Sequence, residues 1–220
     1  MLAGVLALAA CARPAPAPAL GLFTSLPILW SEADGVSAQL DAPAKPHWAK
    51  AVLEEGHRLV ALDTLLHPQG LGDLVIAQPR PLEPAENVAL DGWVRGGGHL
   101  LLFADPLLTS ESHFALGDPR RPADTVLVGP ILAHWGLALG EGRESAGTPF
   151  PVEAPGELAP LPGGPRDCRI EQAGLIAACH IGKGFVLIVA DAALLGPSAG
   201  PDVAGRARSL RELMRRAFVH

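Results

Sequence analysis

The stretch GDLVIAQPRPLEPAENVALDGWVRGGGHLLLFADP, residues 72–106, decides the fold. It contains two almost unbroken apolar runs, LVIA and HLLLF, which are typical of strands buried on both faces of a parallel sheet. Between them, residues 83–98 hold the strongest helix pattern of the chain. A strand, a helix and a second strand in this order predict a βαβ unit with two parallel strands.

The helix expected within residues 83–98 has clear start and stop signals. Pro84 suits the first helical position, and Glu86 lies in the first turn, where the helix dipole favours negative charge. Three consecutive glycines, residues 96–98, end the helix. The apolar residues expected to share one face of it are Val88, Ala89 and Trp93.

Similar signals continue on both sides of this unit. Apolar runs predict further strands within residues 20–29, 57–63 and 182–191, and helix patterns occupy residues 45–56, 126–136 and 203–218. This alternation predicts an α/β fold: a doubly wound, mostly parallel sheet with flanking helices, as in flavodoxin-like proteins, plus a C-terminal β-hairpin and helix. Residues 141–167, rich in Gly, Pro and Glu, are expected to form a loop within the same domain.

The segment CRIEQAGLIAACHI, residues 168–181, predicts a β-hairpin and a disulfide. A two-residue turn at Ala173 and Gly174 places Cys168 directly opposite Cys179, because the turn fixes the register of the two strands. Opposite residues of antiparallel strands have a Cα separation that suits a disulfide. An oxidising compartment favours the bond, whereas in the cytoplasm the two residues would be buried thiols.

The N-terminal stretch LALAACARPAPAPAL, residues 6–20, predicts an export signal. Residues 1–10 are apolar but shorter than the roughly 20 residues of a membrane-spanning helix, and the prolines that follow cannot continue a helix. Their length fits the apolar region of a signal peptide. Residues 8–11, LAAC, resemble the lipobox of bacterial lipoproteins, so Cys11 is the expected lipidation site. Since no Lys or Arg precedes this run, another export signal or an ordinary N-terminal segment stays an alternative.

This interpretation divides the chain into a leader with a Pro-Ala tether, residues 1–20, and a single α/β domain, residues 21–220. The domain would lie on the periplasmic side of a bacterial membrane, held by a lipid anchor; the alternative location is the cytoplasm. A chain of 220 residues that is 49% hydrophobic can form one sizeable core. Its net charge of −6 and its 5% aromatic content argue against nucleic acid as a partner.

Polar side chains follow several predicted strands, and open parallel sheets bind ligands beyond the carboxyl ends of their strands. The candidate crevice residues are Ser25, Asp63, Gln78, Arg80, Asp105 and Asp191. The three aspartates could hold a hard cation such as Mg²⁺. Aspartate after a strand is also a common cap of a turn or helix, and we therefore predict no metal site.

The sequence predicts no catalytic residue and no cofactor. It contains no G-x-S-x-G nucleophile motif, no H-E-x-x-H zinc motif and no G-x-x-x-x-G-K-[ST] phosphate-binding loop. His57, His99 and His180 are each expected at the start of a strand and are interpreted as structural residues.

Two segments resemble the GldG-like auxiliary proteins of ABC-type transport systems and related uncharacterised domains of bacterial membrane-anchored proteins. They are LVIAQPRPLEPAENVALDGWVRGGGHLLLFADPLL, residues 74–108, and GKGFVLIVADAALL, residues 182–195. The resemblance implies a class I glutamine-amidotransferase-like fold. The amidotransferases carry a catalytic cysteine after a central strand, where this chain has Asp105 and Pro106, so the resemblance implies no catalytic residue here.

The sequence therefore predicts a non-enzymatic, exported accessory or binding component of an ABC-type transport system, with transporter subunits as partners. Two alternatives are a hydrolase that uses Asp105 or Asp191, with Ser25 and Gln78 nearby, and a sensor that binds a small molecule or glycan in the same crevice. Convergence of these side chains within about 5 Å in an open pocket would favour the hydrolase, because catalytic groups must reach one another.

Overall fold

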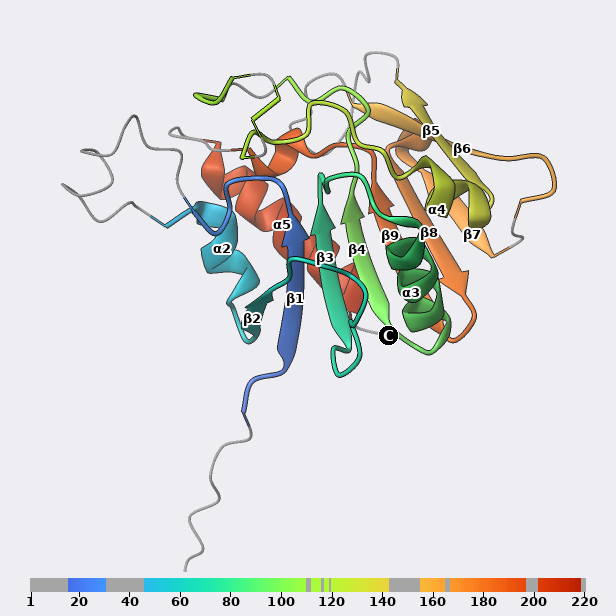
Figure 1. The fold of residues 1–220 in the computed structure, drawn as a ribbon, viewed down its shortest axis with the longest axis horizontal. Helices are drawn as coiled ribbons and strands as arrows, with labels where there is room; N and C mark the ends of the chain where they lie inside the picture. Colours follow the sequence, from blue (N-terminus) through green and yellow to red (C-terminus); the bar gives the residue numbers. More distant parts are fainter. Residues whose placement is uncertain are drawn as a thin grey trace, which may run out of the picture.

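The computed structural model describes residues 16–30, 46–109, 112–115, 117–118, 120–142, 155–164, 167–196 and 202–218. Their central feature is a sheet of seven strands with helices on both faces (Figure 1). Cys11 and the rest of the predicted leader up to residue 15 lie outside the described residues.

The sheet has the strand order β2-β1-β3-β4-β9-β8-β7. Its strands are β1 (Ala19–Thr24), β2 (Arg58–Ala61), β3 (Asp73–Ala77), β4 (His99–Phe103), β7 (Cys168–Glu171), β8 (Ile176–Ile181) and β9 (Gly184–Val189). The strands β2, β1, β3, β4 and β9 are parallel, and β8 is antiparallel to both of its neighbours. The predicted mostly parallel sheet with a C-terminal hairpin is confirmed.

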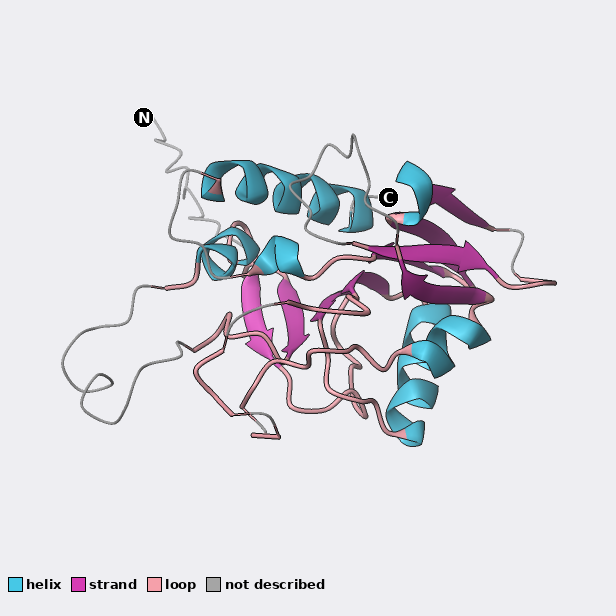
Figure 2. Cartoon of the chain, turned by 90° about the horizontal axis from the view of Figure 1, so that it is seen from above, coloured by secondary structure: helices cyan, strands magenta, loops and turns pink. Residues whose placement is uncertain are grey.

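Helices cover both faces of this sheet, which makes the fold doubly wound (Figure 2). They are α2 (Trp48–Leu53), α3 (Pro84–Arg95), α4 (Gly129–His134) and α5 (Val203–Phe218). On one face Leu22, Val75 and Leu101 are register partners and share a core with α2 and α5. On the other face Leu74 and Leu100 share a core with α3 and α4. Burial of alternate residues on opposite faces explains why the strands are apolar throughout.

The buried face of α3 differs from the predicted one. The helix begins at Pro84 as expected, but its buried residues are Glu86, Leu90 and Val94. Val88, expected on the apolar face, has an exposed fraction of 74%. Glu86 can lie on the buried face because its carboxylate is paired with Arg80. Residues 86, 90 and 94, spaced four apart, therefore form the face of α3 that packs on the sheet.

A second, two-stranded sheet lies beyond α4. It consists of β5 (Leu137–Glu141) and β6 (Gly156–Pro160), which are antiparallel. The expectation of a loop over residues 141–167 is therefore wrong for β6. Cross-strand pairing with β5 supplies the backbone hydrogen bonds that make this Gly- and Pro-rich segment a strand.

The disulfide between Cys168 and Cys179 is present, as the register predicted. The connection between β7 and β8 is longer than expected, because the last paired residues are Glu171 and Ile176. Residues 172–175 form a turn that includes a short 3₁₀ segment, η1 (Gln172–Gly174). The register nevertheless agrees with the prediction, since two extra loop residues, one on each side, leave the cross-strand partners unchanged.

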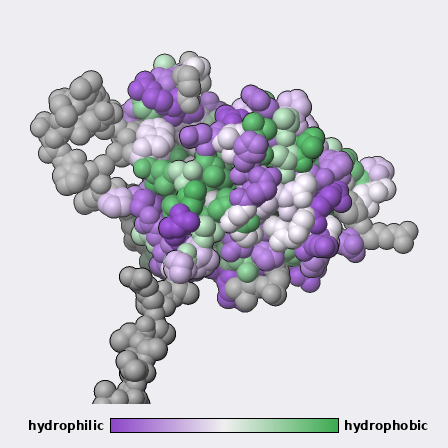
Figure 3. All heavy atoms as spheres, turned by 60° about the horizontal axis from the view of Figure 1, so that its bottom comes forward, coloured by the Kyte–Doolittle hydropathy of each residue, from purple (hydrophilic) through white to green (hydrophobic). Residues whose placement is uncertain are grey.

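The strand β1 begins at Ala19, two residues before the expected start of the domain at Gly21. Pro18 already contacts the sheet, because its carbonyl oxygen accepts a hydrogen bond of 2.9 Å from the N–H of Arg58. The chain thus enters the sheet at the bottom of Figure 1. Seen obliquely from below, hydrophobic residues gather in the middle of the surface among hydrophilic ones (Figure 3). Within the described ranges, no helix has both the length and the apolar character needed to cross a membrane.

Candidate functional site

Four of the six candidate crevice residues lie at the carboxyl ends of the central parallel strands. Ser25 follows β1, Gln78 follows β3, and Asp105 and Asp191 lie two residues beyond β4 and β9. The last three are buried, with exposed fractions of 0%, 1% and 0%. The remaining two candidates belong to a separate network around Glu86.

Gln78 joins the end of β3 to the segment that follows β4. Its side-chain oxygen accepts a hydrogen bond of 2.9 Å from the N–H of Asp105, and its Nε2 donates to the carbonyl oxygens of Asp105 (3.1 Å) and Ala123 (2.8 Å). Its φ of 42° is uncommon for a residue other than glycine. These three hydrogen bonds hold the amide group against the backbone of this chain, where a ligand would otherwise reach it.

Ser25 completes the closure of the strand ends. Its hydroxyl donates to the carbonyl oxygen of Gln78 at 2.5 Å and accepts a hydrogen bond of 3.1 Å from the N–H of Ala123. Both backbone polar groups of Ala123 are therefore fixed, one by Ser25 and one by Gln78. In the strand order β2-β1-β3-β4 the connections reverse direction between β1 and β3, which is where such folds bind ligands. In this protein the backbone at Ala123, bonded to Ser25 and Gln78, occupies that position.

The two buried aspartates are cross-strand neighbours beyond the paired ends of β4 and β9. Asp105 accepts hydrogen bonds from the N–H groups of Leu107 (2.9 Å) and Ala192 (3.4 Å). Asp191 accepts a hydrogen bond of 2.8 Å from the N–H of Ala193, at the start of the short 3₁₀ helix η2 (Ala193–Leu195). Both side chains thus cap the turns that follow their strands, which is the ordinary structural role of aspartate at this position.

The Asp191 carboxyl group is only partly satisfied by these contacts. Its Oδ2 is buried and has no hydrogen-bond partner among the described residues. Burial, followed by the negative charge of Asp105, raises the pKa of Asp191 to about 7, although Arg206 opposes this effect. Burial also raises the pKa of Asp105. The pair therefore holds a proton up to near neutral pH, because two adjacent buried carboxyl groups do not both ionise readily.

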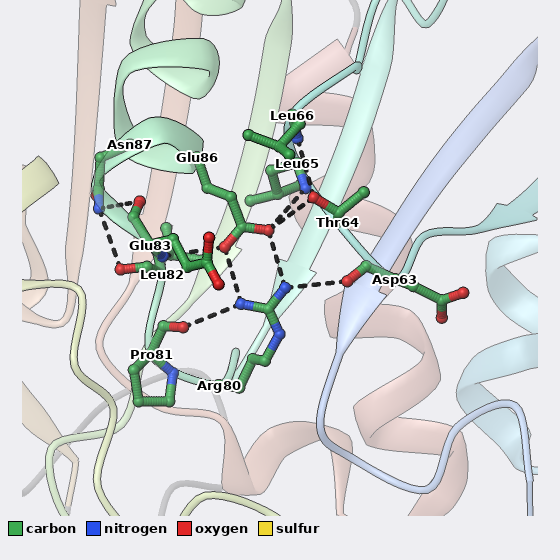
Figure 4. Close-up of polar contacts among 10 residues, drawn as sticks. All are labelled: Asp63, Thr64, Leu65, Leu66, Arg80, Pro81, Leu82, Glu83, Glu86 and Asn87. Atoms are coloured by element: carbon green, nitrogen blue, oxygen red, sulfur yellow. Dashed lines mark hydrogen bonds and ion pairs between the residues drawn. The ribbon is translucent and has the colours of Figure 1, made fainter.

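The other two candidates, Arg80 and Asp63, lie in a separate network (Figure 4). The guanidinium group of Arg80 makes two hydrogen bonds of 2.8 Å to the carboxylate of Glu86 and lies over the Phe23 ring, 5.0 Å from its centroid. Asp63 takes part through its backbone oxygen, which accepts from Arg80 at 3.0 Å, while its carboxylate points away. The expectation that both side chains face the crevice is therefore wrong: Arg80 ties the ends of β2 and β3 to α3.

Glu86 is the residue at the centre of this network, and sequence reasoning assigned it only a dipole effect. Its carboxylate also accepts hydrogen bonds from the N–H groups of Leu65 and Glu83, both at 3.0 Å, and from the hydroxyl of Thr64 at 2.9 Å. The hydrogen bonds from Arg80 are the largest effect that lowers its pKa, to about 2. The three-residue spacing from Glu83 matches a capping box and could have indicated the backbone contact.

The described residues offer no cluster of three or more His, Cys, Asp or Glu side chains that could hold a metal ion. His99 is the first residue of β4, and its Nδ1 lies 3.1 Å from the carboxylate of Asp73. His180 lies near the end of β8, so the expectation of a position at a strand start is wrong. Neither histidine joins the strand-end residues.

The sequence matches no family model and no curated protein. Among solved structures, the chain is similar to an exo-β-1,4-mannosidase from an Opitutaceae bacterium, strain TAV5, with a TM-score of 0.54 and 15% identity over 93% of this chain. The chain spans 36% of the length of that mannosidase. At such low identity, the similarity supports the fold alone.

Two further structures are less similar. The N-terminal domain of mmIFT52 matches with a TM-score of 0.49 and 11% identity, over 92% of this chain and 99% of that domain. A ThuA-like protein from Bacteroides uniformis ATCC 8492 matches with a TM-score of 0.41 and 11% identity, over 94% of both chains. The structure itself shows a doubly wound α/β fold, and its described residues include the disulfide between Cys168 and Cys179.

Proposed function

We propose that this protein is a non-enzymatic binding component, exported and tethered to the periplasmic side of a bacterial membrane through a lipid on Cys11. We further propose that it works as an accessory subunit of an ABC-type transport system, as its resemblance to GldG-like proteins implies. In this proposal the α/β domain has a class I glutamine-amidotransferase-like fold without amidotransferase chemistry.

The observation that carries this proposal is the closure of the strand ends. Enzymes need reacting groups that substrate can reach. Here Gln78 and Asp105 are buried, and their polar atoms bond to the backbone of the same chain. Ser25 is bonded both as donor and as acceptor. Polar groups that are satisfied in this way stabilise a fold and are poorly suited to turnover.

The disulfide supports export. Disulfides persist in oxidising compartments such as the bacterial periplasm and are rare in the cytoplasm. The bond between Cys168 and Cys179 uses two of the three cysteines of the chain, which leaves Cys11 as the third. A single remaining cysteine at the end of a short apolar segment is the arrangement that a lipid anchor requires.

With a lipid on Cys11, the strand β1 would lie close to the membrane. From Cys11 to Ala19 the chain can span at most about 29 Å. A lipid on Cys11 would therefore keep the amino end of β1 within that distance of the bilayer. The hydrophobic residues in the middle of the surface in Figure 3 would then be available to a membrane-bound partner such as a transporter subunit.

Fractionation of the full chain, expressed in a bacterium with a periplasm, tests the proposal. The wild-type protein is expected in the membrane fraction, to incorporate radiolabelled palmitate, and to co-purify with permease or ATPase subunits after detergent extraction. Cys11→Ser should lose the label and the membrane association. The double variant Cys168→Ser/Cys179→Ser is the matched control, because it lacks two cysteines but keeps the anchor. Unlabelled wild-type protein in the cytoplasm, with reduced cysteines, would contradict the proposal.

A hydrolase is the second candidate, favoured by the carboxyl pair alone. A carboxyl group whose pKa is raised to about 7 beside a second carboxyl group is typical of catalytic sites. Hydrolysis of a model ester or glycoside by the purified wild-type protein, lost in Asp191→Asn, would favour this candidate over the binding component. A ligand sensor that uses the same crevice requires displacement of the segment around Ala123, and ligand-induced exchange of the Ala123 amide would detect it.

A further inference from the structure

A groove of about 460 Å³ lies at the opposite end of β4 and β9 from the buried aspartates. Figure 1 shows the elements around it, α3, α4, β8 and the loop that precedes β7, on the same side of the molecule. Its lining includes Arg95, His134, Trp135, Asp167, His180 and Gly182. The volume is in the range of small-molecule sites. None of the residues discussed at the strand carboxyl ends lines it.

A single carboxylate organises the wall formed by α3 and α4. Asp91 accepts a hydrogen bond of 2.8 Å from Nε of Arg95 and one of 2.9 Å from the indole N–H of Trp135. The same carboxylate lies 3.3 Å from Nε2 of His134. Trp135 is buried, whereas the side chains of Arg95 and His134 are 48% and 57% exposed. The buried Trp135 and the Asp91 carboxylate therefore hold the Arg95 guanidinium group and the His134 imidazole ring at the surface of the groove.

The guanidinium group of Arg95 retains donors for a ligand. Nε of Arg95 donates to Asp91, and Nη2 of Arg95 lies 3.5 Å from Nε2 of His134, which is long for a hydrogen bond. In the described part of the chain, no carboxylate bonds to the two terminal nitrogens of Arg95. Terminal guanidinium nitrogens bind carboxylate and phosphate oxygens in pairs.

The carboxyl ends of α3 and α4 point toward this groove and would by themselves attract cations. Several of the last carbonyl groups of both helices already accept hydrogen bonds from the protein itself. The last carbonyls of α3 accept hydrogen bonds from the N–H groups of residues 96–98, and the Arg95 carbonyl accepts one of 3.1 Å from Lys183. At the end of α4, Trp135 and Gly136 donate to carbonyls of the helix in the same way. These hydrogen bonds weaken the contribution of the helix ends, and the side chains of Arg95 and His134 contribute most of the positive charge that a ligand meets.

Glycines allow backbone segments in the walls of the groove to approach one another closely. At Gly182, which has a φ of 63°, an added Cβ would lie 2.8 Å from the Cα of Arg95. At Gly164 an added Cβ would lie 2.6 Å from the carbonyl oxygen of Gly136. A side chain at position 182 would displace the backbone of Arg95, and one at position 164 would displace the backbone of Gly136.

We propose that this groove is a binding site for a small oxyanion, a carboxylate or phosphate group of a soluble ligand, held by Arg95 with His134 and His180 beside it. Asp167, on the rim next to His180, opposes a second negative charge and favours a ligand whose remaining groups are neutral or cationic. This groove lies in a different part of the protein from the strand carboxyl ends, and its ligand binding does not depend on the proposed membrane tether.

Nuclear magnetic resonance of the ¹⁵N-labelled protein tests this proposal with acetate, glucuronate and inorganic phosphate as probes. Saturable shifts confined to the amides of Gly163, Gly164 and Gly182 and to the ring of His134 are expected with at least one probe. Acetate or glucuronate binding without phosphate binding identifies a carboxylate as the ligand group, and the reverse identifies a phosphate.

Two variants assign the binding to the groove. Arg95→Gln is expected to raise the Kd about tenfold, as expected for loss of a charge-assisted hydrogen bond. His134→Ala, at a side chain that is more than half exposed, should also weaken binding and is the second variant if Arg95→Gln does not fold. Arg169→Gln, an arginine that is 78% exposed on β7, is the matched control and should bind as the wild type does. Absence of saturable shifts with all three probes, or equal binding by Arg95→Gln, His134→Ala and the wild type, would overturn the proposal.

Discussion

Replacement of Asp191 by asparagine is predicted to stabilise the protein at alkaline pH but not in acid. In the folded protein, burial and the charge of Asp105 raise the pKa of Asp191 from 3.8 to about 7. The folded state therefore binds this proton more tightly than the unfolded state does. As the pH rises from about 4 to about 7, ionisation of Asp191 lowers the free energy of unfolding, and above that range the loss is complete. Asparagine removes this loss because it carries no charge.

The magnitude follows from the two pKa values and from one hydrogen bond. The rise from 3.8 to about 7 corresponds to about 4 kcal/mol at pH 8, at about 1.36 kcal/mol per pH unit. The oxygen of asparagine can keep the 2.8 Å hydrogen bond from Ala193. Its nitrogen replaces Oδ2, which has no partner among the described residues, and a buried unpaired polar group costs about 1–3 kcal/mol. We expect net stabilisation of about 1–3 kcal/mol at pH 8 and destabilisation of similar size at pH 4.

Urea denaturation of the wild type and of Asp191→Asn at pH 4 and pH 8 measures this difference. Comparison of the two proteins cancels the titrating groups that do not interact with Asp191, and Asp105 is the exception because its charge acts on Asp191. Asp105→Asn should also stabilise at pH 8, because it removes the charge that opposes ionisation of Asp191. The double variant should gain less than the sum of the two, since each replacement relieves the same repulsion. An equal free-energy difference between Asp191→Asn and the wild type at both pH values would refute this reasoning.

Three further predictions concern the other contacts of the domain. Glu86→Gln should lower the free energy of unfolding by about 1–3 kcal/mol at pH 7, because the folded-state pKa of about 2 favours the ionised carboxylate. The upper value is kept low because Arg80, its partner, is half-exposed to solvent. Denaturation at pH 3 should show a smaller difference, since this stabilisation is lost as the pH falls from about 4.5 toward 2. Cys168→Ser/Cys179→Ser should lose about 3 kcal/mol through a less constrained unfolded chain, and reductant should shift the denaturation midpoint of the wild type but not of this variant. Ser25→Ala should speed hydrogen exchange at the Ala123 amide, because the amide N–H donates to the Ser25 hydroxyl. Thr24→Ala is the matched control and should leave this exchange rate unchanged, because the Thr24 hydroxyl bonds only to β3 and to the turn after β1 among the described residues.

Local patterns predicted much of the fold correctly. Strands buried on both faces form apolar runs, so β3, β4 and β9 are recognisable without knowledge of their partners. The boundaries of α3 follow from Pro84 and the glycines after Arg95. The pairing of Cys168 with Cys179 was predictable because a hairpin's register depends only on the residues between its strands.

Contacts between distant segments were not predictable in this way. β6 is a strand only because β5 pairs with it, and its own Gly- and Pro-rich composition indicates a loop. Val88 was expected on the buried face of α3, but Leu90 and Val94 occupy it, because the pairing of Glu86 with Arg80 fixes the rotation of the helix. Helix periodicity shows which residues share a face and leaves open which face a neighbouring element covers.

The sequence by itself determined that polar residues follow the parallel strands, since strand ends and their next residues are local features of the chain. Only the tertiary structure decided what those residues do. Ser25 and Gln78 meet Ala123, which lies 98 residues beyond Ser25, and Arg80 turns to Glu86 instead of toward the crevice. The raised pKa of Asp191 likewise depends on burial and on Asp105 of a neighbouring strand. Burial and charge depend on distances in space, and the order of residues along the chain does not specify those distances until the sheet has formed.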